Sequence, residues 1–230
     1  MVAARRIVFR RRSRVDQTSV CLSNSVVNSS PPLAAGRRAN SRLPQLLDAA
    51  ARTFAERGYA GASVREIVGP VGMLPGSLYC HFATKEELLV AVYARGVERI
   101  GEAVDAAVAK HTDPWTRLDA AAVAHLSSLL DQTNWSQVVI RIRPQDAPLV
   151  EARLVALRDA YESRWQRLVA ALPLARSASR HDLRLFLLGA LNWSQTWYRS
   201  DGGSSPARLA RRCVALLKSG LAASSAKAAA

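Results

Sequence analysis

The sequence is poor in several residue types, and each shortage excludes a class of protein. Its 230 residues include 3 cysteines, and Cys21, Cys80 and Cys213 lie far apart. An odd number at such spacing fits neither a disulfide framework nor a zinc site, so we expect a reducing, cytoplasmic location. No run of 18 apolar residues is present to span a membrane, and residues 1–32 lack the apolar centre of a secretory signal.

The chain also lacks the residue patterns on which most enzymes depend. It contains no paired carboxylates, no metal-ligand cluster, no glycine-rich phosphate loop and no assembled catalytic triad. We therefore expect no enzymatic activity, no catalytic residues, no metal site and no cofactor.

Acidic residues and lysine are scarce. The chain carries 32 basic residues against 18 acidic ones, a net charge of +14, and only 4 of the basic residues are lysine. With the abundant alanine, this arginine bias indicates GC-rich coding, so single arginines carry little weight. Residues 1–42 hold nine Arg and one acid, or +8, which leaves 14 − 8 = +6 for residues 43–230. Binding to phosphate is the natural use of such charge.

Residues 1–38 show no sustained periodicity and contain Ser29-Ser30-Pro31-Pro32, so we expect a disordered basic arm. Two interpretations remain open. In the first, the arm reaches into the minor groove or along phosphates. In the second, it is an inert tail, or the start codon has been assigned too far upstream.

A compact helix-turn-helix follows. Apolar residues at helical spacing predict a first helix from near Arg42 to Arg57, ending at Gly58. Ser63 and Glu66 form a capping box for a second helix, and Gly72 permits a sharp turn. Pro75 opens a third helix, with Leu78 and Phe82 on its buried side. Residues 39–83 are thus predicted to be a three-helix DNA-binding domain.

The rest of the chain reads as further helices. Thr84 and Glu87 form a capping box for a connector helix to Lys110, and Asp113-Pro114 caps the next helix. After a short apolar stretch, Val138 to Ile142, Asp146 is predicted to cap a long helix ending at Pro173. A helix from about Ser179 is apolar almost all round, which predicts burial, and Ser205-Pro206 caps the last one. No segment alternates with period two, so we predict an all-α fold of about nine helices. Residues 84–220 would form a C-terminal domain and 221–230 a flexible tail.

Residues 42–92 resemble the DNA-binding domain of the TetR family of bacterial regulators. The resemblance rests on Phe54, Gly58-Tyr59, Ser63, Ile67, Leu78-Tyr79, His81-Phe82, Lys85-Glu86 and Leu88. The stretch from Gly72 to Tyr79 is similar to a branch that regulates lipid and sterol breakdown. So is the stretch from Gly189 to Gly202, although the family usually has Pro where this chain has Ser200.

The resemblance implies the DNA contacts. Tyr79 and His81 would touch backbone phosphate, with Lys85 at the start of the connector helix, and Arg42, Ser63 and Arg65 are further candidates. Pro75, Gly76, Ser77 and Cys80 would face the bases. These four offer no bidentate donor, so sequence choice would depend on thymine methyl contacts, DNA shape and dimer register.

Simpler roles for the same residues stay open. Tyr79 could belong partly to the core, and His81 could be an ordinary surface histidine. Cys80 could sense oxidants or merely fill space. Cys80 and His81 point about 100 degrees apart on a helix, which argues against a nucleophile and base pair.

The resemblance also implies a C-terminal domain that binds a small molecule and forms a homodimer through helices within 179–219. Helix bundles build apolar cavities, and the tryptophans are the large surfaces available, although each could equally be core. Arg141 and Arg143 could pair with an anionic ligand group. The candidate ligand residues are Trp135, Arg141, Arg143, Trp165, Trp193 and Trp197, and the expected effector is an acyl-CoA thioester or a steroid-like acid.

The leading functional hypothesis is a bacterial transcriptional repressor. A homodimer would bind a pseudo-palindromic double-stranded DNA operator and leave it when the effector binds. Two alternatives remain. One is a constitutive or weakly specific DNA-binding protein that uses its basic arm, and the other is an enzyme with an incidental DNA-binding fold.

Overall fold

The computed structural model describes residues 35–176 and 178–228, and these residues form nine α-helices and no strand. The predicted all-α class is therefore confirmed. Short 3-10 turns lie at Gly69–Val71, Pro144–Asp146, Pro148–Val150 and Ser194–Thr196. The helices are α1 (Ala35–Gly61), α2 (Val64–Val68), α3 (Pro75–Leu78), α4 (Lys85–Val108), α5 (Pro114–Leu129), α6 (Asn134–Arg141), α7 (Glu151–Ala170), α8 (Arg180–Trp193) and α9 (Pro206–Ala228).

Side-chain caps start most of these helices where the sequence predicts them. The hydroxyl of Ser63 accepts a hydrogen bond from the Glu66 N–H, and the Glu66 carboxylate accepts one from the Ser63 N–H, which completes the capping box. Thr84, Asp113 and Ser179 each accept a hydrogen bond from the N–H three residues on. Each bond satisfies a helix N–H that has no partner within the helix.

Two glycines supply the turns of the helix-turn-helix. Gly58 has φ +69 and interrupts α1 where the sequence predicts its end. Gly72 has φ +63 and ψ 33, the left-handed conformation in which a side chain is disfavoured. Both positions therefore favour glycine for conformational reasons.

Several predicted boundaries need correction. Helix α1 begins at Ala35, inside the range 1–38 predicted to be disordered, and residues 1–34 lie outside the described part of the chain. Asp146 caps the 3-10 turn at 144–146 instead of α7, which begins at Glu151 after a second turn. Helix α9 continues to Ala228, where a flexible tail was expected.

The third helix is also shorter than predicted. Helix α3 ends at Leu78, and Tyr79, Cys80 and His81 follow in a turn. Leu78 is fully buried, whereas Phe82 is only half-buried against the same core. Leu78 and Phe82 thus both pack against this core as predicted, but the residues between them form a turn and not a helix.

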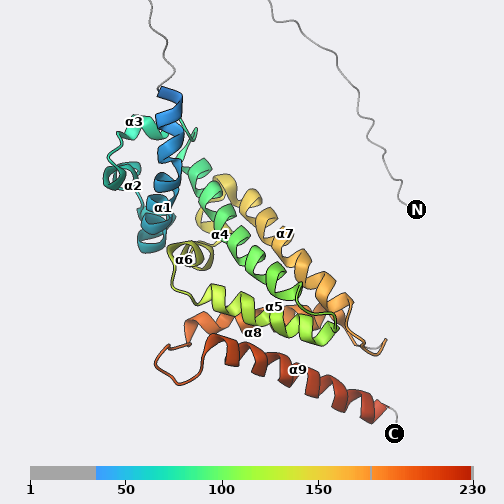
Figure 1. The fold of residues 1–230 in the computed structure, drawn as a ribbon. Helices are drawn as coiled ribbons and strands as arrows, with labels where there is room; N and C mark the ends of the chain where they lie inside the picture. The colour runs from blue at the N-terminus through green and yellow to red at the C-terminus, as the bar shows by residue number, and fades with distance from the viewer. Residues whose placement is uncertain (1–34, 177, 229–230) are drawn as a thin grey trace, which may run out of the picture.

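Figure 1 shows α1, α2 and α3 gathered at one end of the molecule and α5, α8 and α9 at the other. Helix α4 runs between the two ends beside α7, and α6 packs against both α1 and α4. The first hydrophobic core does not stop at residue 83. It includes Val138 of α6, Val150, and Leu154 of α7 together with α1 to α4. The DNA-binding helices α1 to α3 therefore share a core with α4, α6 and the start of α7.

A second core joins α5, α7, α8 and α9 around Leu126, Trp165 and Leu187. Within the described residues, no helix is both long and apolar enough to cross a lipid bilayer.

Candidate DNA-binding surface and ligand cavity

The turn that follows α3 presents polar side chains to solvent. The Tyr79 side chain is 56% exposed and Cys80 is exposed, while His81 is half-buried. On α3 itself, Gly76 is exposed and Pro75 and Ser77 are half-buried. The predicted DNA contacts from Pro75 to His81 therefore lie on one short segment that is open to solvent.

Arg42, Ser63 and Arg65 lie on other elements, with Arg42 on α1, Ser63 at the N-cap of α2 and Arg65 on α2. The Arg42 guanidinium donates to the Gly72 carbonyl across 3.4 Å, which brings α1 to the turn before α3. Arg65 is exposed on α2. The Ser63 hydroxyl is occupied by the capping box, where it also donates to Glu66 Oε2 at 2.8 Å. This bond holds the pKa of the Glu66 carboxyl below its ordinary value.

Lys85 ties the connector helix to the helix-turn-helix. Its ammonium donates to the carbonyls of Tyr59 and Ala62, both at 3.0 Å, and lies 4.3 Å from the Tyr59 ring centroid. The Tyr59 hydroxyl in turn donates to the Glu86 carboxylate. Partial burial and that carboxylate raise the pKa of Tyr59 to about 12, and the bond lowers the pKa of Glu86. Lys85 thus has a structural role beside any contact with phosphate.

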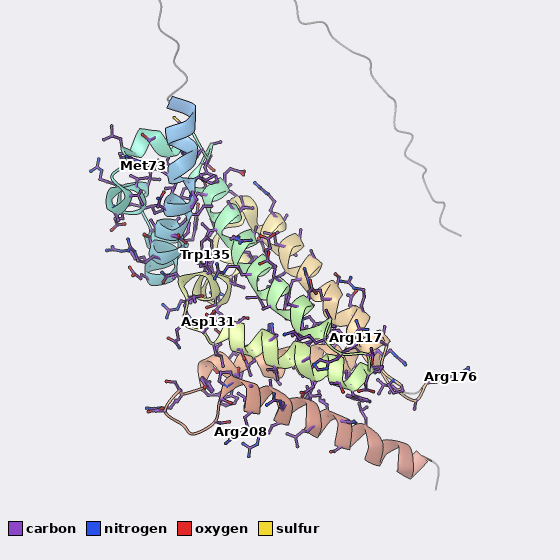
Figure 2. All side chains as sticks on the ribbon, in the orientation of Figure 1. Met73, Arg117, Asp131, Trp135, Arg176 and Arg208 are labelled. Carbon is purple, nitrogen blue, oxygen red and sulfur yellow. The ribbon has the colours of Figure 1, made fainter. Side chains whose placement is uncertain are left out.

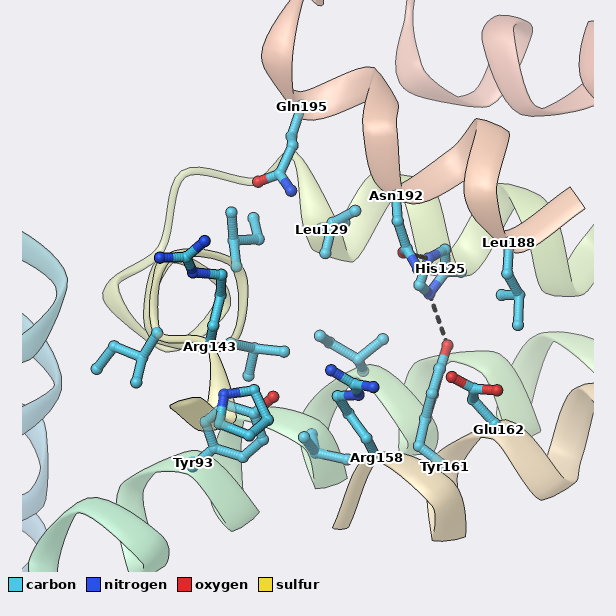
Figure 3. A pocket seen from close by; sticks show the side chains of 16 residues that line it. Tyr93, His125, Leu129, Arg143, Arg158, Tyr161, Glu162, Leu188, Asn192 and Gln195 are labelled. Carbon is cyan, nitrogen blue, oxygen red and sulfur yellow. Dashed lines mark hydrogen bonds between the residues drawn. The ribbon is translucent and has the colours of Figure 1, made fainter. Parts of the chain in front are cut away.

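A cavity of about 380 Å³ lies beyond the shared core, between α4, α5, α6, α7 and α8. Half of the residues that line it are aliphatic, among them Val97 and Leu188. Figure 3 shows the polar side chains that make up the other half. They are Tyr93, His125, Arg143, Arg158, Tyr161, Glu162, Asn192 and Gln195.

The buried His125 side chain joins the half-buried Tyr161 and the exposed Asn192 in one hydrogen-bond network. The Nδ1 of His125 lies 2.6 Å from the Tyr161 hydroxyl, and its Nε2 lies 3.0 Å from Asn192 Oδ1. The ring also packs edge-on against Trp165. Burial lowers the pKa of His125 to about 4, so the ring is neutral at pH 7. Because Asn192 Oδ1 can only accept, Nε2 carries the proton and Nδ1 accepts from Tyr161.

Two arginines contribute positive charge to the cavity. Arg143 pairs with Asp146 across 3.4 Å and remains largely exposed. Arg158 is exposed on α7 and also lines the cavity. By contrast, Glu162 is held by the buried Arg184 guanidinium at 2.6 Å, so its charge is already balanced.

Of the six predicted ligand residues, the structure brings Arg143 to this cavity. Arg141 instead donates to the Ala55 carbonyl of α1 at 2.9 Å. Trp135 packs against the first core, near α1 (Figure 2). Trp165 is fully buried in the second core. Trp193 and Trp197 are 67% and 54% exposed, on and just after α8.

Apart from Arg143, the polar residues of the cavity were not predicted from the sequence. Nothing in the local sequence marks His125 or Tyr161 as more than a residue on one side of a helix. Asn192 lies in the Gly189 to Gly202 stretch that carries the family resemblance, and this was the available signal. Tyr161 lies 36 residues after His125 and Asn192 lies 67 residues after it, each on a different helix. Sequence spacing alone therefore could not reveal the network.

Helix α8 exposes an apolar face in the single chain, although the sequence predicted a buried helix. Phe186 is 68% exposed and lies seven residues before Trp193, so both project from the same side. Leu185 on α8 and Leu216 on α9 add to the exposed apolar surface.

Known proteins match the chain in both of its parts. Residues 46–92 match the family described as bacterial regulatory proteins of the tetR family. Residues 111–221 match the tetracyclin repressor-like C-terminal domain. The two ranges together span more than half of the chain.

Similar proteins are transcriptional regulators. The activator FasR of Mycolicibacterium smegmatis is 34% identical over 137 residues, which cover 55% of this chain and 63% of FasR. The repressor KstR2 of Mycobacterium tuberculosis is 28% identical over 189 residues, which cover 79% of this chain and 94% of KstR2.

The fold is shared with FadR of Bacillus subtilis in complex with stearoyl-CoA. That structure superposes with a TM-score of 0.68 at 20% identity, over 77% of this chain and 98% of FadR. The helix-turn-helix, the C-terminal helices and these matches together show that the chain belongs to the TetR family of bacterial transcriptional regulators and is not an enzyme.

Proposed function

We propose that the protein is a homodimeric repressor that leaves a pseudo-palindromic operator when a hydrophobic or acyl-CoA-type ligand enters the cavity. The observation that carries this proposal is that the cavity and the helix-turn-helix share packed elements. Helix α4 lines the cavity with Val97 and Ile100 and is tied at its start to the α1–α2 turn through Lys85. Such a regulator would act on DNA in the bacterial cytoplasm.

At the DNA end, the exposed turn after α3 would meet the operator. Tyr79 and His81 would contact phosphate, and so would Arg42 and Arg65 from either side. Lys85 donates two of its three ammonium protons to carbonyls, so a phosphate would receive the third. Pro75, Gly76, Ser77 and Cys80 would face base edges, where they favour methyl contacts and shape over bidentate hydrogen bonds.

At the ligand end, size and charge favour an apolar molecule with an anionic group. The aliphatic side chains would hold a hydrocarbon, and Arg143 and Arg158 would pair with a carboxylate or phosphate. The stearoyl-CoA complex of FadR and the ketosteroid regulator KstR2 support this class.

Helix α6 offers the route from ligand to DNA. Val139 and Ile140 line the cavity, while the next residue, Arg141, holds the Ala55 carbonyl of α1 at 2.9 Å. A ligand that displaces α6 would therefore move α1 and change the separation of the two recognition segments. It would weaken DNA binding by its difference in affinity for the two states.

The test begins with selecting duplexes from a random library with the purified full-length chain at fixed salt. Binding to the selected sequence is then measured with and without acyl-CoA thioesters and their free acids. We expect a palindromic consensus and release by one ligand class. The Arg158→Gln variant should keep its operator affinity and need more ligand for release. Arg176→Gln changes an exposed arginine that does not line the cavity, and it should behave like the wild type.

Other outcomes would contradict the proposal. Equal affinity for scrambled DNA with a steep salt dependence would favour the nonspecific DNA-binding protein that uses its basic arm. A specific operator that no ligand of these classes releases would exclude them as inducers. A further test scrambles those base steps of the operator that the α3 segment does not reach. Weaker binding is expected if the protein reads DNA shape, and unchanged affinity would count against shape readout.

A further inference from the structure

The hydrogen bonds of His125 leave unused capacity on the cavity side. The Tyr161 hydroxyl donates its proton to His125, so its oxygen retains a lone pair that can accept. Asn192 uses its oxygen toward His125, and its amide NH₂ remains as a donor. All three side chains line the cavity. One wall can therefore both accept and donate a hydrogen bond.

This wall lies across the cavity from Arg143, whereas Arg158 precedes Tyr161 by three residues on α7 and lies beside it (Figure 3). Figure 3 shows His125 and Asn192 on one side of the cavity and Arg143 on the other, with apolar side chains between them. A ligand whose anionic group pairs with Arg143 would place the far part of its hydrocarbon near the His125 side.

We propose that the wall formed by His125, Tyr161 and Asn192 binds a hydroxyl or carbonyl group on the hydrocarbon part of the effector. This inference rests on the proposed ligand function of the cavity and narrows the ligand class. The effector is an oxygenated hydrocarbon acid or its thioester, and a plain alkyl chain is the weaker ligand.

The geometry supports a recognition role beside a structural one. His125 is buried, but Tyr161 is half-buried and Asn192 is exposed, and all three line the cavity, so the two partners of His125 have polar atoms within reach of a ligand. The ring of His125 is fixed by two hydrogen bonds and by Trp165, so the Tyr161 oxygen and the Asn192 amide are held in place before a ligand arrives. Such preorganisation reduces the entropy cost of binding.

Matched probes isolate this contact. Isothermal calorimetry on the full-length chain would compare dodecanoic acid with 12-hydroxydodecanoic acid, and then the corresponding pairs with 8, 10 and 14 carbons. At the chain length that reaches the wall, we expect the hydroxylated acid to bind about threefold to tenfold more tightly, the gain from one additional hydrogen bond. The Tyr161→Phe variant should lose this preference.

Tyr93→Phe is the matched control, because it removes a cavity hydroxyl from α4 instead of from the network. It should retain the preference. A second measurement does not depend on any variant's stability. The chain has 4 histidines, so the ring nitrogen signals of His125 can be followed by NMR. They should shift with the hydroxylated acid and stay nearly unchanged with the plain acid.

The outcomes separate this inference from the proposed function. Equal binding of both acids at every chain length, or a preference that survives in Tyr161→Phe, would overturn the inference and leave the cavity as an apolar ligand site. Failure of every acid to bind would count against the proposed ligand class as well as the inference.

Discussion

His125 is a titratable side chain kept in its neutral form by its surroundings. Its ring is 3% exposed, and its two nitrogens are bonded to neutral partners, a tyrosine and an amide. A proton added to Nδ1 would break the hydrogen bond that Tyr161 donates and place a charge in the core. The pKa of the ring therefore falls to about 4, from an ordinary value near 6.5.

This lowered pKa predicts a loss of stability in mild acid. Above about pH 6.5 the ring is neutral in both the folded and unfolded states, so it contributes no pH dependence. Between pH 6.5 and 4 the unfolded chain binds the proton and the folded chain does not. The free energy of unfolding should then decrease by on the order of 3 kcal/mol. Urea unfolding at pH 7.0, 5.5 and 4.5 measures this decrease.

Comparison with His125→Asn isolates the contribution of this residue. The variant should be less stable at pH 7 but should lose less stability on acidification. Carboxyls with lowered pKa, such as Glu66 and Glu86, also stop stabilising the fold as pH falls, but they do so in both proteins. His111→Gln, which alters an exposed histidine, should keep the wild-type slope, and identical slopes in all three proteins would refute the prediction.

At the residue level, local chemistry was predictable and distant pairing was not. Ser63 with Glu66 and Asp113 with Thr116 are three residues apart, so the capping signal lies within one helical turn. The partner of Arg141 is the Ala55 carbonyl, 86 residues earlier. The sequence suggested a ligand role for this arginine because nothing in it indicates which backbone α6 will meet.

The crossing of α4 and α6 depends on a glycine. A Cβ at Gly96 would lie 2.7 Å from Val139 Cγ2 and 2.9 Å from the Trp135 carbonyl oxygen. The two helices therefore approach too closely for a side chain at this point. Because Val139 also lines the cavity, the crossing sets the position of the wall that a ligand would push.

Gly96→Ala should therefore be destabilising, even though alanine is the better helix former. The added methyl group overpacks the crossing, which costs about 1–3 kcal/mol. Gly220→Ala is the matched control, since Gly220 lies within α9 and nothing lies within 4 Å of its would-be Cβ. Thermal and urea unfolding should show a loss in the first variant and little change or a small gain in the second. A Gly96→Ala protein as stable as the wild type would show that α6 can shift freely.

Element positions were predicted best where hydrophobic periodicity and a cap agree. Helices α4 and α5 satisfy both conditions and begin where predicted. Asp146 was predicted to cap the long helix, but it caps the 3-10 turn at 144–146. Pro148 follows too soon for that turn to continue as a helix, so α7 starts at Glu151. Tyr79 to His81 were placed on a helix because their spacing fits one, yet α3 ends at Leu78.

At the scale of the whole molecule, most of the large exposed apolar side chains lie on or between α8 and α9, at the end opposite the helix-turn-helix. Exposed residues on α8 include Phe186 and Trp193, and α9 adds Leu216 (Figure 1). The centre of α8 is apolar almost all round in sequence, which predicted a buried helix. In the single chain, Leu185, Phe186 and Trp193 on this helix remain exposed. A large exposed apolar patch of this kind indicates an interface, which supports the proposed dimer through residues 179–219.

Phe186→Glu should convert the proposed dimer into a monomer that still folds. The side chain is 68% exposed, so the change leaves the chain's own core intact but places a charge in the shared surface. Sedimentation velocity should show half the mass. Operator affinity should fall at least about 100-fold, because two linked recognition segments become one. Leu149→Glu is the control, since Leu149 is 85% exposed and precedes α7, apart from α8 and α9. It should retain the dimer and its affinity. A Phe186→Glu protein that remains dimeric with full operator affinity would move the interface away from this face.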